Sequence, residues 1–238
     1  MKGPGTPLEK MPYHVGIIMD GNGRWAEMKG LPRFEGHSRG AERAREIIKA
    51  SREIGVKVLT LYTFSLENWQ RPKPEIRMLM KLLELYLMNE MHEFKKEGIC
   101  FRAIGEIQKL PASVKDLIKE SEALTASCTG MTLIAAISYS GRNEILRAAR
   151  RAIASGINPN ELDENSFSGF LDTAGLPEPD LVIRTSGEKR MSNFLLWQSA
   201  YSELYFTETL WPDFGREELL EALRSYQERD RRFGTVRL

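Results

Sequence analysis

Six short apolar segments alternate with longer amphipathic segments along most of this 238-residue chain. The apolar segments have the length of buried strands, and the segments between them carry apolar residues at helical spacing. This alternation predicts an α/β fold in which helices surround a central, mostly parallel six-stranded sheet. The expected strands are 15–19, 56–64, 99–104, 132–138, 180–184 and 203–207, and the expected helices are 38–54, 75–97, 112–126, 142–155, 163–173 and 216–231.

The length of the chain is that of one sizeable folded unit. No internal repeat, low-complexity tract or linker interrupts it, and 156–160 has the composition of a loop within a domain. We therefore expect a flexible lead over 1–13, a single domain over 14–234 and a short tail over 235–238.

The charge balance argues against nucleic acid as a partner. Lys and Arg number 34 and Asp and Glu 33, so the formal net charge is 34 − 33 = +1. No strong overall field would attract a polyanion. Any anion-binding site must be built locally, in loops that concentrate arginine.

Few features point to secretion or to a membrane anchor. Cys100 and Cys128 are the only cysteines, with no Cys-x-x-Cys spacing, which favours a reducing environment. Residues 1–7 lack the apolar stretch of a signal peptide, and no run has the length of a transmembrane helix. We expect a cytoplasmic protein whose contact with a membrane, if it has one, is peripheral.

Glycine- and arginine-rich loops follow two of the expected strands. The run 14–19 ends in Asp20-Gly-Asn-Gly-Arg-Trp25, and the run 179–183 leads into Arg184-Thr-Ser-Gly-Glu-Lys-Arg190 and Ser192. Guanidinium groups, hydroxyls and backbone N–H groups are what a diphosphate needs. Either loop alone could be a solvated surface loop. Both are expected at the carboxyl ends of strands, where α/β folds bind ligands, so together they predict one anion site.

Asp20 is the residue in this region that suggests a metal ion. A carboxylate beside a phosphate cradle would repel the ligand unless a cation lies between them. Mg²⁺ prefers one or two carboxylates together with substrate oxygens. Taken alone, an aspartate at this position is more often a helix cap.

Five separated motifs, in order, resemble those of the cis-prenyltransferases, the undecaprenyl diphosphate synthase family. The resemblance covers about 14–234 and implies an enzyme that uses magnesium to condense isopentenyl diphosphate with an allylic diphosphate, farnesyl diphosphate being expected. The implied product is a long cis-polyprenyl diphosphate, of undecaprenyl type for a cell-wall lipid carrier, with a shorter product as the alternative. The motifs are MDGNGRWA (19–26), RFEGHSRG (33–40), YTFSLENWQRPKPE (62–75), RTSGEKRMSNFLLWQ (184–198) and ELYFTETLWPDF (203–214).

The resemblance also implies residue roles. Asp20 would hold Mg²⁺ and assist departure of diphosphate, Asn68 would act at the proton-removal step, and Glu203 would be a second magnesium contact across the site. Arg232 and Gly234 would reach into the active site of a partner subunit, which implies a homodimer. The implied substrate-binding residues are Gly21, Asn22, Gly23, Arg24, Trp25, Arg33, His37, Ser65, Leu66, Glu67, Trp69, Arg71, Arg184, Arg190, Met191, Ser192, Arg232 and Gly234.

Two segments keep two interpretations each. The segment 64–75 contains Arg71-Pro72 and Lys73-Pro74, which favour a mobile flap over substrate, with Trp69 either stacking on isoprenoid carbons or anchoring the flap to the core. The helix 76–91 is apolar around much of its circumference. It is either buried on two sides or lines a hydrophobic tunnel for the growing chain.

Three other classes of protein fit the sequence less well. Residues 21–26 fit the Gly-x-Gly-x-x-Ala pattern of dinucleotide-binding oxidoreductases, but Arg24 and Trp25 put bulk and charge in the turn, and no acidic residue ends a second strand at the expected distance. A non-catalytic partner subunit would have lost the motif residues that this chain retains.

The chain has no Asp-Asp pair, which argues against the trans-prenyltransferases. Ser138-Tyr-Ser140-Gly stands where the family commonly has Asn-Tyr-Gly-Gly, and we expect only a packing effect.

Overall fold

The computed structural model describes residues 10–229 of the chain. Within them, six strands form one sheet in the order β3-β4-β2-β1-β5-β6, and every neighbouring pair is parallel. The predicted fold class is confirmed, and the predicted strands differ from the observed ones by no more than two residues at either end. The strands are β1 (His14–Ile18), β2 (Val58–Ser65), β3 (Cys100–Ile104), β4 (Thr132–Tyr139), β5 (Leu181–Arg184) and β6 (Glu203–Phe206).

Strand β1 lies inside the sheet, between β2 and β5. All five of its residues are buried, as expected for a parallel strand covered on both faces. Its last residue, Ile18, lies opposite Tyr62 of β2 and Arg184 of β5. The loops that leave β1 and β5 therefore begin side by side at one edge of the sheet, although 166 residues separate Ile18 from Arg184 in sequence.

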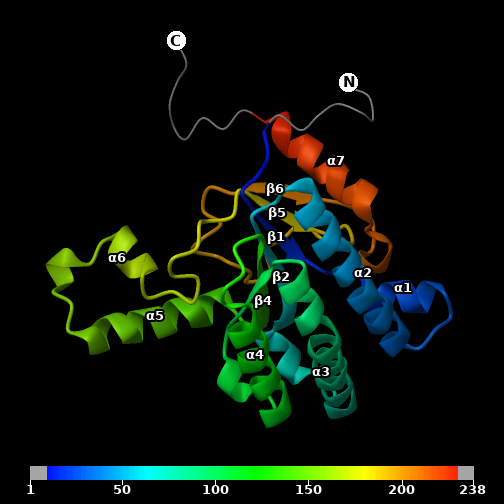
Figure 1. The fold of residues 1–238 in the computed structure, drawn as a ribbon, viewed down its shortest axis with the longest axis horizontal. Helices are drawn as coiled ribbons and strands as arrows, with labels where there is room; N and C mark the ends of the chain where they lie inside the picture. The colour runs from blue at the N-terminus through cyan, green and yellow to red at the C-terminus, as the bar shows by residue number, and fades with distance from the viewer. Residues whose placement is uncertain (1–9, 230–238) are drawn as a thin grey trace.

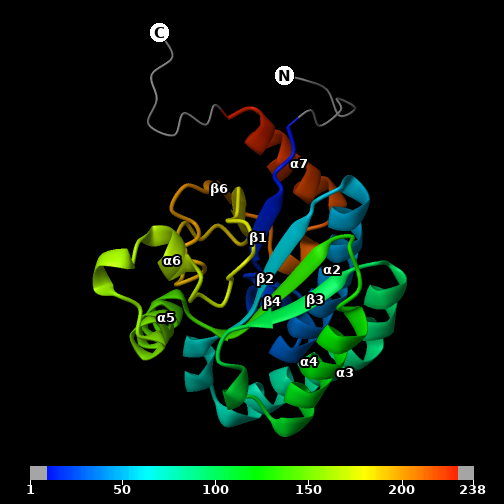
Figure 2. The same cartoon turned by 60° about the vertical axis from the view of Figure 1, so that its left-hand side comes forward.

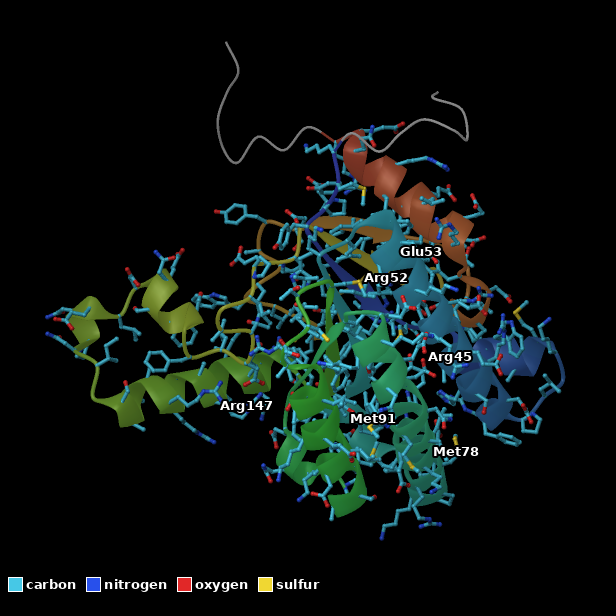
Figure 3. The ribbon with its side chains drawn as sticks, in the orientation of Figure 1. Arg45, Arg52, Glu53, Met78, Met91 and Arg147 are labelled. Carbon is cyan, nitrogen blue, oxygen red and sulfur yellow. The ribbon has the colours of Figure 1, made fainter. Side chains whose placement is uncertain are left out.

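One face of the sheet carries most of the helices and the larger hydrophobic core (Figures 1 and 2). Side chains of α2 and α3 meet there. Arg45 and Arg52 of α2, labelled in Figure 3, pair with Glu90 of α3 and with Glu97, the residue after α3. The helices of this layer are α2 (Arg33–Ile54), α3 (Lys73–Lys96), α4 (Ala112–Thr125) and α7 (Arg216–Gln227), with the short α1 (Asn22–Met28) packed on α2.

The other face of the sheet is covered in part by an irregular segment, where the sequence predicted helices. Phe194 and Leu195, from the irregular segment after β5, are fully buried against it. Helices α5 (Gly141–Ser155) and α6 (Glu164–Ser168) project sideways as an arm (Figure 1). The predicted helix 163–173 is wrong in length, because Asp163 and Ser166 cap a single short turn and the chain then bends through 169–174.

Helix α2 begins five residues earlier than predicted. Pro32 precedes it with extended geometry, so Arg33 is its first residue and both Arg33 and His37 lie in its first turns. Short 3₁₀ helices complete the fold: η1 (Leu66–Gln70), η2 (Ile107–Lys109), η3 (Pro159–Glu161) and η4 (Trp211–Asp213).

The ends of the predicted domain are described only in part. Tyr13, the last residue of the predicted lead, donates its N–H to Asp180 Oδ2 at 2.8 Å. Residues 1–9 and 230–238, with the predicted tail, lie outside the described part. No helix among residues 10–229 is long and apolar enough to cross a bilayer.

Candidate active site

An open cleft of about 710 Å³ lies at the carboxyl edge of β1, β2 and β5. Its lining combines residues from the segments that follow β1, β2 and β5 and from the first turns of α2. Of the residues singled out from the sequence, the cleft brings together Asp20, Asn22, His37, Ser65, Glu67, Asn68, Arg71, Arg184, Met191 and Ser192.

Arg184 joins the two anion loops. It is the last residue of β5 and only 3% exposed, and its Nη2 donates to Asp20 Oδ2 at 2.8 Å. Its Nη1 donates to Ser192 Oγ at 2.6 Å and to the Arg190 carbonyl. Its Nε is buried and has no hydrogen-bond partner. A guanidinium fixed by protein acceptors thus lines the cleft and places a positive charge beside it.

Asp20 keeps bonding capacity toward the cleft. Oδ1 accepts the Gly21 N–H at 2.9 Å and Oδ2 accepts from Arg184, which leaves lone pairs on both oxygens. The side chain is 38% exposed. A single carboxylate of this kind suits Mg²⁺ when phosphate oxygens supply other ligands. Residues 10–229 contain no cluster of three or more His, Cys, Asp or Glu side chains that could hold a metal alone.

The turn after Asp20 is packed tightly through glycines. Gly21 has φ = 110°, which L side chains rarely adopt. In α2, a Cβ on Gly36 would lie 2.0 Å from the Asn22 carbonyl oxygen, and a Cβ on Gly40 would lie 2.1 Å from Asn22 Oδ1. These two glycines let α1 approach α2, which holds the loop in place beside the cleft.

Two other residues of this loop are tied down. Arg24 Nη2 donates to Ser186 Oγ at 2.5 Å and to its carbonyl at 2.9 Å. Trp25 Nε1 donates to Asp213 Oδ1 at 2.8 Å. Gly23 lies under the Arg33 guanidinium, so a Cβ there would meet it at 2.8 Å.

Three cationic or titratable side chains surround one carboxylate at the start of α2 and α3. Glu75 Oε1 lies 3.1 Å from Arg71 Nη1, 3.9 Å from Arg33 Nη2 and 3.9 Å from His37 Nε2. Burial, then the charge of Arg71, lowers the pKa of His37 to about 4, so the imidazole is neutral at pH 7. Its Nε2 is buried without a hydrogen-bond partner. The cluster favours an incoming anion.

The segment predicted as a flap contains an ordered 3₁₀ helix. Asn68 Oδ1 accepts the Ser65 N–H at 3.1 Å and so caps η1, which also contains Leu66. Trp69 Nε1 donates to Ser138 Oγ at 2.9 Å, and its ring packs edge-on against Phe64. The anchoring role considered for Trp69 is the one that these contacts support.

Nine predicted residues within the described part do not line the cleft, and two of them, Arg190 and Glu203, are engaged elsewhere in ways that affect their predicted roles. The other seven are Gly21, Gly23, Arg24, Trp25, Arg33, Leu66 and Trp69. The Arg190 guanidinium is 60% exposed and pairs with Glu188, while only its carbonyl faces Arg184. Glu203 is the first residue of β6, level with Leu181 and hence with Val15 of β1. It therefore lies about 16 Å behind Asp20 along the strand direction, at about 3.3 Å per residue.

Glu203 is also engaged elsewhere. Its Oε2 accepts from Arg229 Nη1 at 2.7 Å. The prediction that Glu203 faces Asp20 across one site is therefore wrong within a single chain, because strand direction puts the two carboxylates at opposite edges of the sheet. Arg232 and Gly234 lie outside the described residues.

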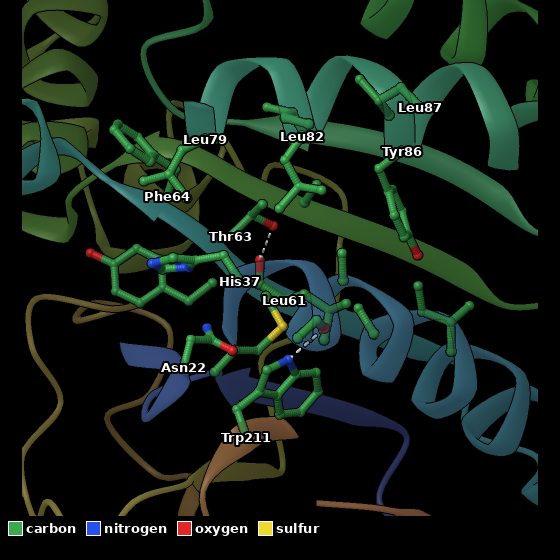
Figure 4. A pocket seen from close by; sticks show the side chains of 18 of the residues that line it. Asn22, His37, Leu61, Thr63, Phe64, Leu79, Leu82, Tyr86, Leu87 and Trp211 are labelled. Carbon is green, nitrogen blue, oxygen red and sulfur yellow. Dashed lines mark hydrogen bonds between the residues drawn. The ribbon is translucent and has the colours of Figure 1, made fainter. Parts of the chain in front are cut away.

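An apolar cavity of about 140 Å³ adjoins the cleft between α2, α3 and the sheet (Figure 4). Figure 4 shows Asn22 and His37 near one end and Tyr86 and Leu87 farther along α3. The cavity and the cleft share Met19, Asn22, His37, Tyr62, Thr63, Phe64 and Leu79.

Sequence reasoning missed several of these residues. Ala41, Ala44 and Ile48 of α2 line the apolar cavity, and their helical spacing after Gly40 was a usable signal. Arg142 and Asn193 line the cleft. Nothing local in the sequence separates these two from ordinary loop residues.

A cleft with paired arginine loops, next to an apolar cavity that shares seven of its lining residues, defines a protein suited to ligands with an anionic head and a hydrocarbon tail. The chain belongs to the undecaprenyl diphosphate synthase family: residues 18–234 match the family model described as "Putative undecaprenyl diphosphate synthase". It is a prenyltransferase. The dinucleotide-binding and non-catalytic alternatives are thereby set aside.

Relatives and solved structures agree over nearly the whole chain. An isoprenyl transferase of Aquifex aeolicus is 50% identical over 95% of this chain and 97% of its own length, and one of Prochlorococcus marinus is 52% identical over 96% and 85%. Lavandulyl diphosphate synthase from Lavandula x intermedia, solved with dimethylallyl diphosphate, has a TM-score of 0.91 at 40% identity, covering 94% of this chain and 99% of that one. A probable undecaprenyl diphosphate synthase from Campylobacter jejuni has a TM-score of 0.80 at 34% identity, covering 95% and 100%.

Proposed function

We propose that this enzyme elongates an allylic diphosphate, farnesyl diphosphate in the first instance, by adding isopentenyl diphosphate units with cis double bonds. The observation that carries the proposal is that the arginine-lined cleft and the apolar cavity between α2 and α3 share seven lining residues. A diphosphate head and a prenyl tail need that juxtaposition.

The allylic diphosphate would bind through the loop 21–25, Arg33 and His37, with its tail directed into the apolar cavity. The unpartnered Nε2 of His37 and the cations around Glu75 favour its phosphates. The shared lining residues lead from that site to Leu83 and Tyr86. This path is the tunnel that we propose for the growing chain.

Isopentenyl diphosphate would bind at Arg184, Ser192 and Arg190. The spare Nε of Arg184 supports this assignment, and Arg190 would have to leave Glu188 and turn toward the ligand. Isopentenyl diphosphate and the allylic substrate would then meet above Asp20, which begins the first loop and accepts a hydrogen bond from Arg184 at the start of the second.

Asp20 would hold Mg²⁺ together with substrate oxygens, and the ion when bound would supply positive charge for the departing diphosphate. Arg24, Arg33 and the N–H groups of the glycine turn would stabilise the same charge as the allylic C–O bond breaks. The isopentenyl double bond attacks the allylic carbon, and a proton leaves near Asn68, which would orient the acceptor. Glu203 can reach such a cation only from a second copy of the chain.

A homodimer is part of the proposal. The arm that projects from the sheet exposes Leu146 (59%), Ile153 (81%) and Leu162 (40%), and exposed apolar side chains of this size favour an interface. We place the enzyme in the cytoplasm, with peripheral contact to the inner face of the membrane when a long product leaves. A product of undecaprenyl type for cell-wall synthesis is proposed, and a shorter polyprenyl product is the alternative.

The test is incubation with labelled isopentenyl diphosphate, farnesyl diphosphate and Mg²⁺, with products separated by chain length. Wild-type enzyme should give one dominant long product, and Asp20→Ala should abolish it while the protein stays folded. Absence of incorporation by folded wild-type protein would refute the proposal. Omission of Mg²⁺ should stop the reaction.

A further inference from the structure

Asn193 uses its whole side-chain amide to connect three separate segments. Its Nδ2 donates to Glu67 Oε1 at 2.9 Å and to Ser140 Oγ at 2.5 Å, and its Oδ1 accepts the Arg142 N–H at 2.9 Å. Both amide hydrogens and the amide oxygen are therefore engaged. Neither the motif comparison nor the proposed mechanism gives this residue a role.

The bonds to α5 replace the helix's own cap. Ser140 occupies the N-cap position but makes no side-chain cap bond. Instead, the Gly141 N–H donates to the Asn193 carbonyl at 2.7 Å, and the Arg142 N–H donates to the Asn193 side chain. Unsatisfied N–H groups at the start of a helix are costly, so a cap supplied from a distant loop fixes that loop against the helix.

The bond to Glu67 joins the loop after β5 to the segment that contains Asn68. Burial opposes a charge on Glu67, but hydrogen bonds, first that from Asn193, lower its pKa. Next to this bond, the Ser192 carbonyl accepts from Tyr62 Oη at 3.3 Å, and the Tyr62 ring stacks on Phe194 at 4.7 Å. Ser192 and Asn193 are thus held from both sides.

The local backbone needs this support. Ser192 has φ = 45° and Asn193 has φ = 65°, both in the left-handed region that costs most residues free energy. Asn tolerates this region better than most other side chains. The conformation turns Ser192 Oγ toward Arg184.

We propose that Asn193 is a positioning residue that holds the Arg184–Ser192 loop in register with the Ser65–Asn68 segment, and so sets the geometry of the second substrate against the proton-removal step. The inference rests on the proposed binding of isopentenyl diphosphate at Arg184 and Ser192. Loss of the connection would loosen that site and misalign it with Asn68, while the allylic site around Arg33 and His37 would remain as it is.

The test is a charge-swap cycle at Asn193 and Glu67. Asn193→Asp keeps the size and the helix cap but replaces the donor with a carboxylate facing Glu67. We expect the KM for isopentenyl diphosphate to rise roughly tenfold or more, as for a lost hydrogen bond to a charged group, with a lower kcat. The double variant with Glu67→Gln restores a donor–acceptor pair and should return both constants to within about threefold of Glu67→Gln alone. Binding of farnesyl diphosphate, measured directly, should stay within about twofold in every variant.

Two controls keep the outcomes separate. Asn160→Asp adds the same charge in the exposed 3₁₀ helix η3 and should leave KM, kcat and melting temperature unchanged. Equal losses in binding of both substrates, or a double variant no better than Asn193→Asp, would overturn the positioning role. Wild-type enzyme that incorporates no isopentenyl diphosphate would instead overturn the proposed function.

Discussion

Mild acid should destabilise this enzyme through His37. The folded-state pKa is about 4 against an ordinary value of 6.5, because burial and Arg71 disfavour the charged ring. Between these values the unfolded chain binds a proton that the folded chain does not. The stabilising contribution is therefore complete above pH 6.5 and is lost progressively as the pH falls toward 4.

The two pKa values set the size of the effect. From pH 7 to pH 5, a single histidine with this shift lowers the free energy of unfolding by about 2 kcal/mol. Burial lowers the pKa of His14 to about 4 as well, so the two histidines together would account for about 4 kcal/mol. That loss is a large part of the stability of an ordinary domain.

The assay is urea unfolding of wild-type enzyme and His37→Gln at pH 7 and pH 5, with equal m-values as a condition for comparison. Glutamine does not titrate, so the variant should lose about 2 kcal/mol less than wild type over this interval. Carboxylates titrate alike in both proteins and cancel. The same pH dependence in both proteins would refute the reasoning. A bound allylic diphosphate, by placing negative charge beside His37, should reduce the pH dependence of wild type.

Three further outcomes are expected. Gly36→Ala brings a Cβ against the Asn22 carbonyl, and this overpacking should cost about 1–3 kcal/mol. The cost should outweigh a helix-propensity gain of about 1 kcal/mol and lower the urea midpoint of unfolding. Ser38→Ala in the same helix should not lower it. Arg184→Lys cannot reproduce the fork that bonds Asp20 and Ser192, so the KM for isopentenyl diphosphate should rise at least tenfold in steady-state assays; an unchanged KM would contradict the assigned site. Ala44→Leu partly fills the apolar cavity and should shorten the products separated by chain length, and an unaltered distribution would place the tunnel elsewhere.

The sequence predicted the sheet well because its strands are apolar runs bounded by charged residues, glycines and prolines. Their spacing left room for helical crossovers and so required parallel pairing. The loops after β1 and β5 could be placed together for the same reason. Helix α6 was misjudged because its short capped turn, followed by bends, has the composition of a longer helix.

The position of Glu203 was predicted from the motif alone, although the topology of the sheet already argued against it. A residue that begins a parallel strand lies at the amino edge of the sheet, away from residues that follow strands, and the predicted strand 203–207 already implied this. Arg190 was a different case, since sequence spacing does not determine which way a side chain turns from an irregular loop. Asn193 caps a helix that begins 52 residues earlier, and such non-local bonds leave no local pattern.

The pairing of β1 with β5 has a consequence for synthesis of the enzyme. Before residues 181–184 are made, the edge of β1 that β5 later covers has no partner, and an unpaired apolar strand edge can associate with other chains. At about 5–20 residues per second, the interval from Ile18 to Arg184 lasts roughly 8–33 s. During this time the nascent chain holds only one of its two arginine loops, and Trp211, which lines the α2–α3 cavity, has not yet been made. A chain that is released before β5 has been made would therefore have exposed apolar surface, an unpaired sheet edge and no complete site. Such a chain is a substrate for chaperones or proteases.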